Sequence, residues 1–200
     1  SAVNITCYLN GWSRQLGAPE GLLPLPSGSA RLENVPPYMI LKKNQNGTVL
    51  AQGRGLMIFD ACYGRGATID SPPDIDSTNH FDLLVPTNEV PALEAVIPEL
   101  NLPANASYDQ KLQAVGKFFL TKFSYSTWQG TDKLATKDAS PLTRFLLTSR
   151  SGHCEYFASA TVLLLRQLGI PARYAVGYSV HEPRGSGYIV RERDAHAWCL

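Results

Sequence analysis

The sequence predicts an α+β fold in which a central buried helix packs on an antiparallel sheet, preceded by a small N-terminal β region. Three observations predict it. The first 80 residues hold short strand-like runs between prolines and glycines, which break helices and mark turns. Residues 154–168 are apolar almost all round a helix, and such a helix lies in the centre of a domain. A run rich in tyrosine and valine follows at 172–180, with further strand-like runs at 188–191 and 195–200.

In the N-terminal β region, residues 38–41 and 48–51 are expected to form two strands of a hairpin. The Asn-Gln-Asn-Gly sequence at 44–47 supplies the turn between them. Residues 55–61 form another expected strand. The polar, proline-containing stretch at 70–79 is expected to be an exposed loop.

The texture of the sequence changes near residue 80, so we expect an N-terminal β-rich region at 1–80 and a second domain at 81–200. The second domain is expected to be truncated at its C-terminal end, because residues 195–200 stop in mid-strand without a turn. Its expected elements before the central helix are a strand at 81–86, short helices at 90–100 and 141–148, and a helix at 107–123 with a capping box of Ser107 and Gln110. Residues 182–187 are expected to form a turn-rich loop.

Charge and composition exclude several classes of protein. The chain has 18 Lys and Arg against 17 Asp and Glu, for a formal net charge of +1, so neither nucleic acid nor an acidic membrane surface is expected as a partner. No apolar run reaches the roughly 18 residues that a membrane segment needs. The four cysteines form no Cys-x-x-Cys pair, and no metal or cofactor is expected. Cys7 and Cys62 are either bridged or unpaired, and the sequence leaves both alternatives open.

Cys154 stands where a catalytic cysteine is needed, at the start of the predicted buried helix. A helix N-terminus offers unpaired N–H groups and a partial positive charge, which favour the thiolate and can stabilise an oxyanion. Gly152, two residues earlier, allows close approach of the backbone and a substrate. On this stretch alone, a small buried core cysteine is an equally good interpretation.

A cysteine nucleophile needs a base, and His196 is the best candidate of the four histidines. It lies in Asp194-Ala195-His196-Ala197-Trp198, where small neighbours leave the ring accessible. A lone histidine in a strand is more often an ordinary core residue, so the assignment depends on the motifs around it.

Those motifs occur in a fixed order: Gly-His-Cys-Glu-Tyr-Phe-Ala at 152–158, Leu-Arg-Gln-Leu-Gly-Ile-Pro-Ala-Arg at 165–173, Gly-Tyr at 177–178 and Asp-Ala-His-Ala-Trp at 194–198. Together they resemble the core of bacterial transglutaminase-like proteins, a cysteine enzyme family on the papain-like α+β fold. The resemblance is specific across residues 150–198 and does not cover residues 1–78.

The resemblance implies a thiol acyl transferase or a cysteine protease-like hydrolase, in which Cys154 and His196 act on protein or peptide carboxamides through a thioester. A third residue that orients the histidine is expected beyond it, outside this chain. Asp194 is too far along the strand to reach the ring well and is expected to be structural. A catalytically inactive binding or scaffold domain is the alternative, and a metal site of Cys154, Asp194 and His196 is a weaker one.

Two further residues are candidates for a role, Trp128 from its place in a loop before the nucleophile helix and Arg173 from its resemblance to a family position. Trp128 is a candidate for substrate binding, although packing over the core is the favoured interpretation of a loop tryptophan. Arg173 is expected to pair with an acidic side chain in a structural role. Relatives in the family are often extracytoplasmic parts of larger membrane proteins, so a periplasmic or cell-surface location is expected by analogy.

Overall fold

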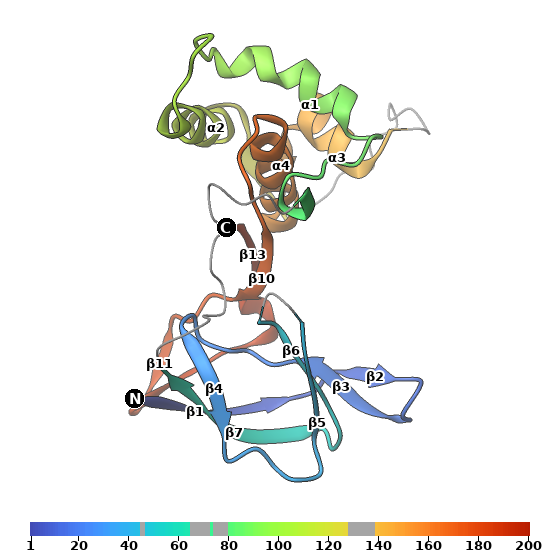
Figure 1. Ribbon diagram of the computed structural model, residues 1–200, viewed down its shortest axis with the longest axis vertical. Coiled ribbons are helices and arrows are strands. Elements are labelled where there is room, and N and C mark those ends of the chain that lie inside the picture. Colours follow the sequence, from blue (N-terminus) through green and yellow to red (C-terminus); the bar gives the residue numbers. More distant parts are fainter. Residues whose placement is uncertain (45–46, 65–72, 74–79, 128–138) are drawn as a thin grey trace. The chain divides into compact units, whose positions relative to one another are not determined.

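The structure is a computed structural model, and it describes residues 1–44, 47–64, 73, 80–127 and 139–200. The chain forms two compact units, Ser1–Ser71 and Pro72–Leu200 (Figure 1). The expected domain boundary at residue 80 stays a prediction.

The first unit contains two antiparallel sheets. One has the order β1-β7-β4 and the other has the order β2-β3-β6-β5. The strands are β1 (Ala2–Tyr8), β2 (Gly11–Ser13), β3 (Ala18–Leu22), β4 (Ser29–Glu33), β5 (Ile40–Lys43), β6 (Val49–Gln52) and β7 (Leu56–Tyr63). The predicted hairpin is confirmed, since β5 pairs with β6, although two residues of its turn lie outside the described residues.

Alternate side chains of strand β7 form part of the buried core of this unit. Met57, Phe59 and Ala61 alternate along it and are fully buried, while Leu56 and Ile58 point outward, as the two-residue period of a strand requires.

The register of β1 on β7 also shows whether Cys7 and Cys62 can form a disulfide. Cys7 lies opposite Met57, whereas Cys62 lies opposite Ala2, so the two thiols are about 17 Å apart along the ladder. Both cysteines are free.

The second unit packs helices and short strands around one central helix. The elements before that helix are η1 (His80–Asp82), α1 (Val90–Val96), η2 (Ile97–Leu100), α2 (Tyr108–Lys122), β8 (Ser124–Tyr125), α3 (Pro141–Arg144), the π-helical turn η3 (Phe145–Ser149) and β9 (Ser151–Gly152). The central helix is α4 (Cys154–Gln167), followed by β10 (Tyr174–Tyr178), β11 (Glu182–Arg184), β12 (Gly187–Ile189), η4 (Glu192–Asp194) and β13 (Ala195–Cys199).

Helix α4 is the core element that the sequence predicted. It packs against α1, α2 and α3 and against β9, β10 and β13 (Figure 1). Ala160 and Leu164 are fully buried on it, because apolar residues occupy most of its circumference. Strands β10 and β13 form an antiparallel pair. The expected fold class, a buried helix packed on an antiparallel sheet after a small β region, is thus confirmed.

Short sequence motifs correctly predicted the positions of the other helices in this unit. The capping box at the start of α2 is confirmed: the Gln110 N–H donates to Ser107 Oγ at 3.3 Å and the Ser107 N–H donates to Gln110 Oε1 at 2.8 Å. The helices expected at 90–100 and 141–148 are confirmed as α1 with η2 and as α3 with η3.

Two expected elements are wrong. Residues 81–86 do not form a strand, because their carbonyls bond elsewhere: Asp82 O accepts from the Ala172 N–H and Leu84 O accepts from Arg166 Nη1. The stretch at 182–187 is part of a β-hairpin, since β11 pairs with β12 through a turn in which Gly185 takes a φ of 59°.

A bidentate ion pair joins the start of the second unit to the residue just before β10. Arg173 Nε donates to Asp82 Oδ1 at 2.9 Å, and Arg173 Nη2 donates to Asp82 Oδ2 at 2.7 Å. The Asp82 side chain is buried, so this contact satisfies a carboxylate that has little access to water. The expected pairing of Arg173 with an acidic side chain is confirmed.

Candidate active site

Cys154 is the first residue of α4, and its side chain is half-buried. The preceding residue, His153, has an extended backbone and makes no side-chain capping hydrogen bond. Its carbonyl accepts from the N–H groups of Tyr156 and Phe157. The N–H groups at the very start of the helix therefore have no cap from His153 and are available to another acceptor.

A short parallel strand pair holds the backbone just before Cys154. Strand β8 pairs with β9, so that Tyr125 lies beside Gly152. The Ser124 N–H donates to Arg150 O at 2.9 Å, and the Ser126 N–H donates to Gly152 O at 2.8 Å. These bonds fix the position from which α4 begins.

Gly152 is required at this point by close packing. A Cβ on it would lie 3.1 Å from Phe145 Cδ2 and 3.1 Å from Tyr156 Cδ2. The rings of Phe145 and Tyr156 stack at 5.4 Å between centroids, so a Cβ at this position would require them to shift by a few tenths of an ångström. The close packing expected at Gly152 is seen with the rings of Phe145 and Tyr156, and close approach by a substrate stays a prediction.

Aromatic rings continue from there along the start of α4. Phe157 contacts a cluster whose other members are Phe119, Phe123, Tyr125 and Phe145, mostly edge to face. Aromatic pairs of this kind bury large rigid surfaces and hold one another in place. The first turn of α4 is thus anchored on the side that carries Phe157.

Arg150 secures the turn that leads into β9. Its backbone is left-handed, with a φ of 46°. Its guanidinium lies 5.5 Å from the centre of the Phe123 ring, and its Nη2 donates to Glu99 Oε1 at 2.6 Å. The same contact and that of Lys122 hold the pKa of the Glu99 carboxyl below its usual range.

His196 is the second residue of β13, and it is exposed. Its direct partner across the ladder is Gly177 on β10. Trp198, on the same strand face as His196, extends its indole over Gly177: a Cβ on Gly177 would lie 2.7 Å from Trp198 Cη2. Glycine at 177 therefore gives the tryptophan its place beside the histidine.

The two predicted catalytic residues lie on neighbouring elements, because α4 packs against β13. Within the described part of the chain, neither the Cys154 thiol nor the His196 ring makes a hydrogen bond, with each other or with another group. The bond between sulfur and imidazole stays a prediction. Trp128, the candidate for substrate binding, lies outside the described residues.

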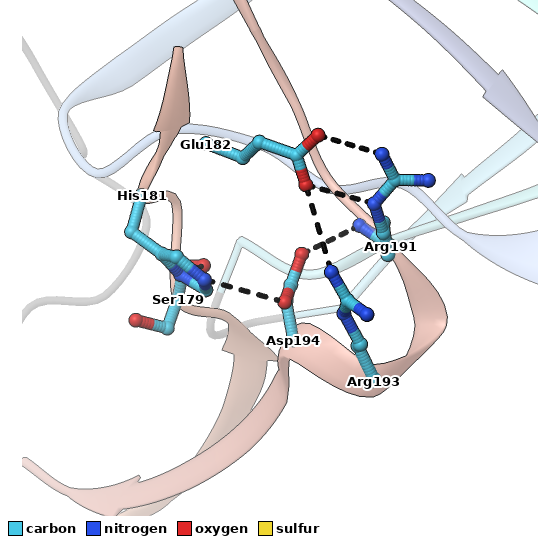
Figure 2. A network of polar contacts seen from close by, with 6 residues as sticks. All are labelled: Ser179, His181, Glu182, Arg191, Arg193 and Asp194. Atoms are coloured by element: carbon cyan, nitrogen blue, oxygen red, sulfur yellow. Dashed lines mark hydrogen bonds and ion pairs between the residues drawn. The ribbon is translucent and has the colours of Figure 1, made fainter.

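Asp194 is a structural residue, as its spacing from His196 indicated. Its buried carboxylate accepts the Arg191 N–H at Oδ2, at 2.7 Å, and so caps η4 just before β13 (Figure 2). Its backbone O accepts the Ser179 N–H at 2.8 Å, which ties the two strands together beyond β10.

Around Asp194, charged side chains hold the base of the β11–β12 hairpin (Figure 2). Glu182 takes two hydrogen bonds from Arg191, which lower the pKa of its carboxyl. His181 Nδ1 donates to Ser179 O at 2.9 Å, and its Nε2 lies 3.7 Å from Asp194 Oδ1. Among the described residues, no three His, Cys, Asp or Glu side chains are grouped so as to hold a metal ion.

Two tyrosines on elements around α4 were not predicted. Tyr125 on β8 stacks on Phe157. Tyr174 is the first residue of β10, which packs against α4, and burial raises the pKa of its hydroxyl. Neither position carries a sequence signal that distinguishes it from the other tyrosines, since only the pairing of β8 with β9 and of β10 with β13 brings them here.

Residues 95–199, more than half of the chain, match the transglutaminase-like superfamily. The chain therefore belongs to this family. Over 123 residues, which are 60% of the chain and 18% of the relative, it is 34% identical to a protein-glutamine gamma-glutamyltransferase of Pseudomonas aeruginosa. The chain spans less than a fifth of the length of the curated relatives that it matches.

Solved structures show the same fold. The periplasmic domain of TgpA from Pseudomonas aeruginosa, in its ethylmercury-bound crystal structure, has a TM-score of 0.52 at 22% identity over 90% of this chain and 65% of that one. A candidate cysteine protease from Cytophaga hutchinsonii has a TM-score of 0.51 at 16% identity over 99% of this chain and 70% of that one. At these identities the likeness concerns the fold alone. None of the helices in the described residues has the length and apolar character that a membrane crossing requires.

Proposed function

We propose that this chain carries the acyl-transfer site of a transglutaminase-like thiol enzyme, with Cys154 as nucleophile and His196 as base. The observation that carries the proposal is the position of Cys154 at the uncapped start of a buried helix that packs against the strand of His196. The family match, which includes both residues, supports it.

The chemistry follows from these two groups. His196 takes the proton of the Cys154 thiol, and the sulfur attacks the carbonyl carbon of a protein or peptide carboxamide. The N–H groups at the start of α4 stabilise the negative oxygen that forms. The carbon–nitrogen bond then breaks, His196 returns the proton to the leaving nitrogen, and ammonia departs from a thioester.

A second substrate resolves the thioester. An amine attacks the same carbon and gives one proton to His196, the carbon–sulfur bond breaks, and the proton passes to the sulfur. The products are a new amide and free Cys154. With water in place of the amine the product is a carboxylic acid, so transamidation and hydrolysis share one intermediate. An extracytoplasmic location is part of the proposal, since a fold neighbour is a periplasmic domain.

Alkylation tests the proposal on the whole chain. Iodoacetamide at neutral pH is expected to label Cys154 before the other three cysteines, measured by peptide mass spectrometry over time. The variant Cys154→Ala is expected to lose transfer of a fluorescent amine to a glutamine-containing peptide. The matched control is Cys7→Ala, in the other unit, which is expected to retain transfer.

One observation favours the alternative of a non-catalytic binding domain: in the described residues, the Cys154 thiol and the exposed His196 ring make no hydrogen bond. That alternative predicts equal labelling of all the accessible cysteines. It also predicts that neither ammonia nor a labelled peptide is released by the unchanged protein.

A further inference from the structure

The ring of His196 takes its position from the backbone of β13. Within the described part of the chain the exposed ring makes no hydrogen bond, so no polar contact fixes it directly. Its strand is hydrogen-bonded to β10, and His196 lies opposite Gly177 in the ladder. The place of the imidazole therefore depends on how firmly β13 is held near residue 196.

Asp194 holds β13 at the end nearest to His196. It is the last residue of η4 and lies directly before the first residue of β13. Its backbone O accepts the Ser179 N–H at 2.8 Å, which extends the ladder beyond Gly177 and His196. Its own N–H donates to Arg191 O at 2.9 Å. The backbone of Asp194 is thus bonded on both sides, where the chain leaves η4 and enters β13.

The carboxylate of Asp194 fastens the same corner with its side chain. Only 5% of that side chain is exposed. Its Oδ2 accepts the Arg191 N–H at 2.7 Å, and its Oδ1 lies 3.7 Å from His181 Nε2 (Figure 2). Arg191 is in turn held by Glu182, because its Nε and Nη2 donate to the two carboxylate oxygens at 2.8 and 2.6 Å. Loss of the Asp194 carboxylate would leave the Arg191 N–H without its acceptor, so the corner would have to rearrange to pair it again.

We propose that Asp194 is a positioning residue for His196. Its carboxylate fixes the corner between η4 and β13, and the fixed corner holds the imidazole where it can take the proton of the Cys154 thiol. The inference rests on the proposed function, since it concerns the base of that reaction. A base transfers protons only within hydrogen-bond reach, about 3 Å, so a small shift of the corner slows the chemical step without weakening substrate binding.

Kinetics of amine transfer on the whole chain test the role of the carboxylate. Asp194→Ala is expected to lower kcat about tenfold, while KM for a glutamine-containing peptide stays within about twofold. Asp194→Asn loses the charge but keeps an oxygen that can accept the Arg191 N–H, so its kcat is expected to stay within about threefold of the unchanged protein. If Asp194→Ala does not fold, Asp194→Ser, whose side chain is too short to reach the same N–H well, takes its place with the same expected direction.

Ser107→Ala is the matched control, because it removes a different capping side chain in the same unit. Ser107 Oγ accepts the Gln110 N–H at the start of α2. Both alanine variants are expected to unfold at a lower urea concentration, but only Asp194→Ala is expected to lose kcat. Equal kcat values for Asp194→Ala and Ser107→Ala would show that Asp194 is merely structural and would overturn the inference. A kcat for Asp194→Asn as low as that for Asp194→Ala would overturn it too, since the hydrogen bond to Arg191 would then not be the cause.

The nuclear magnetic resonance signal of the His196 ring gives a readout that needs no activity. The Cε1–H signal is assigned by its loss in His196→Gln. In Asp194→Ala it is expected to shift and broaden, because the ring leaves its fixed place, whereas in Asp194→Asn and Ser107→Ala it is expected to remain sharp. A sharp and unshifted signal in Asp194→Ala overturns the inference at any transfer rate. If the signal changes as expected but the unchanged protein transfers no amine and shows no preferred labelling of Cys154, the placement of the ring is supported and the proposed function fails.

Discussion

The indole of Trp198 lies over Gly177, and Gly177 is the residue directly opposite His196 in the β10–β13 ladder. The tryptophan and the histidine are two residues apart on one strand, so they share a face. A glycine across from the histidine is thus what lets the Trp198 indole extend over this position.

Replacing Gly177 by alanine is expected to displace Trp198, because the new Cβ would lie 2.7 Å from Cη2. Overpacking of this kind lowers the free energy of unfolding by about 1–3 kcal/mol. Since the displaced ring adjoins His196, acyl transfer is expected to fall more than stability does. Urea unfolding and the amine-transfer assay measure the two effects.

Gly187→Ala is the control for this change. Gly187 lies on β12, and a Cβ there would meet nothing within 4 Å. The prediction is contradicted if Gly177→Ala unfolds at the same urea concentration as Gly187→Ala and transfers amine at the same rate.

Removal of Arg173 is expected to destabilise the chain strongly. The variant Arg173→Ala leaves the buried Asp82 carboxylate without its two donors, and breaking a buried pair lowers the free energy of unfolding by about 3 kcal/mol. Arg173→Lys keeps the charge but loses the bidentate geometry, so its loss is expected to be smaller. Arg184→Ala, on β11, provides a surface control for urea unfolding. A loss in Arg173→Ala no larger than in that control contradicts the prediction.

The Cys199 thiol gives a pH dependence whose sign is fixed. Burial raises its pKa from 9.0 to about 11, and Arg166 opposes that shift. The folded state thus favours the neutral thiol, and the stability that this contributes is complete below pH 9 and is lost as pH rises toward 11. The free energy of unfolding of the unchanged protein is expected to fall relative to that of Cys199→Ala between these values. Urea unfolding at a series of pH values checks it, and a difference that stays constant across the series disproves it.

Local patterns were enough to predict the elements that depend on neighbouring residues. Two examples depend only on residues that are close together in the sequence: the capping box of Ser107 and Gln110, and the apolar run of α4. Both are confirmed. The strand expected at 81–86 failed because its carbonyls are used by Ala172 and Arg166, which are more than 80 residues away. The spacing of apolar residues within a short segment cannot predict hydrogen bonds to such distant residues.

The same distinction holds for the site. Cys154 at the start of a helix and His196 in a later strand followed from motif order, and the structure has both in those elements. The stacking of Tyr125 on Phe157 could not be predicted, because only the pairing of β8 with β9 brings Tyr125 beside the start of α4. The hydrogen bond between the thiol and the imidazole stays a prediction, and Trp128 lies outside the described residues.

The bidentate contact of Arg173 with Asp82 joins positions 91 residues apart. Closing the long loop between these positions has an entropic cost, so we expect the contact to form late in folding. The ion pair is then expected to slow unfolding more than it speeds folding. For the domain around α4, the expected consequence is a longer native lifetime.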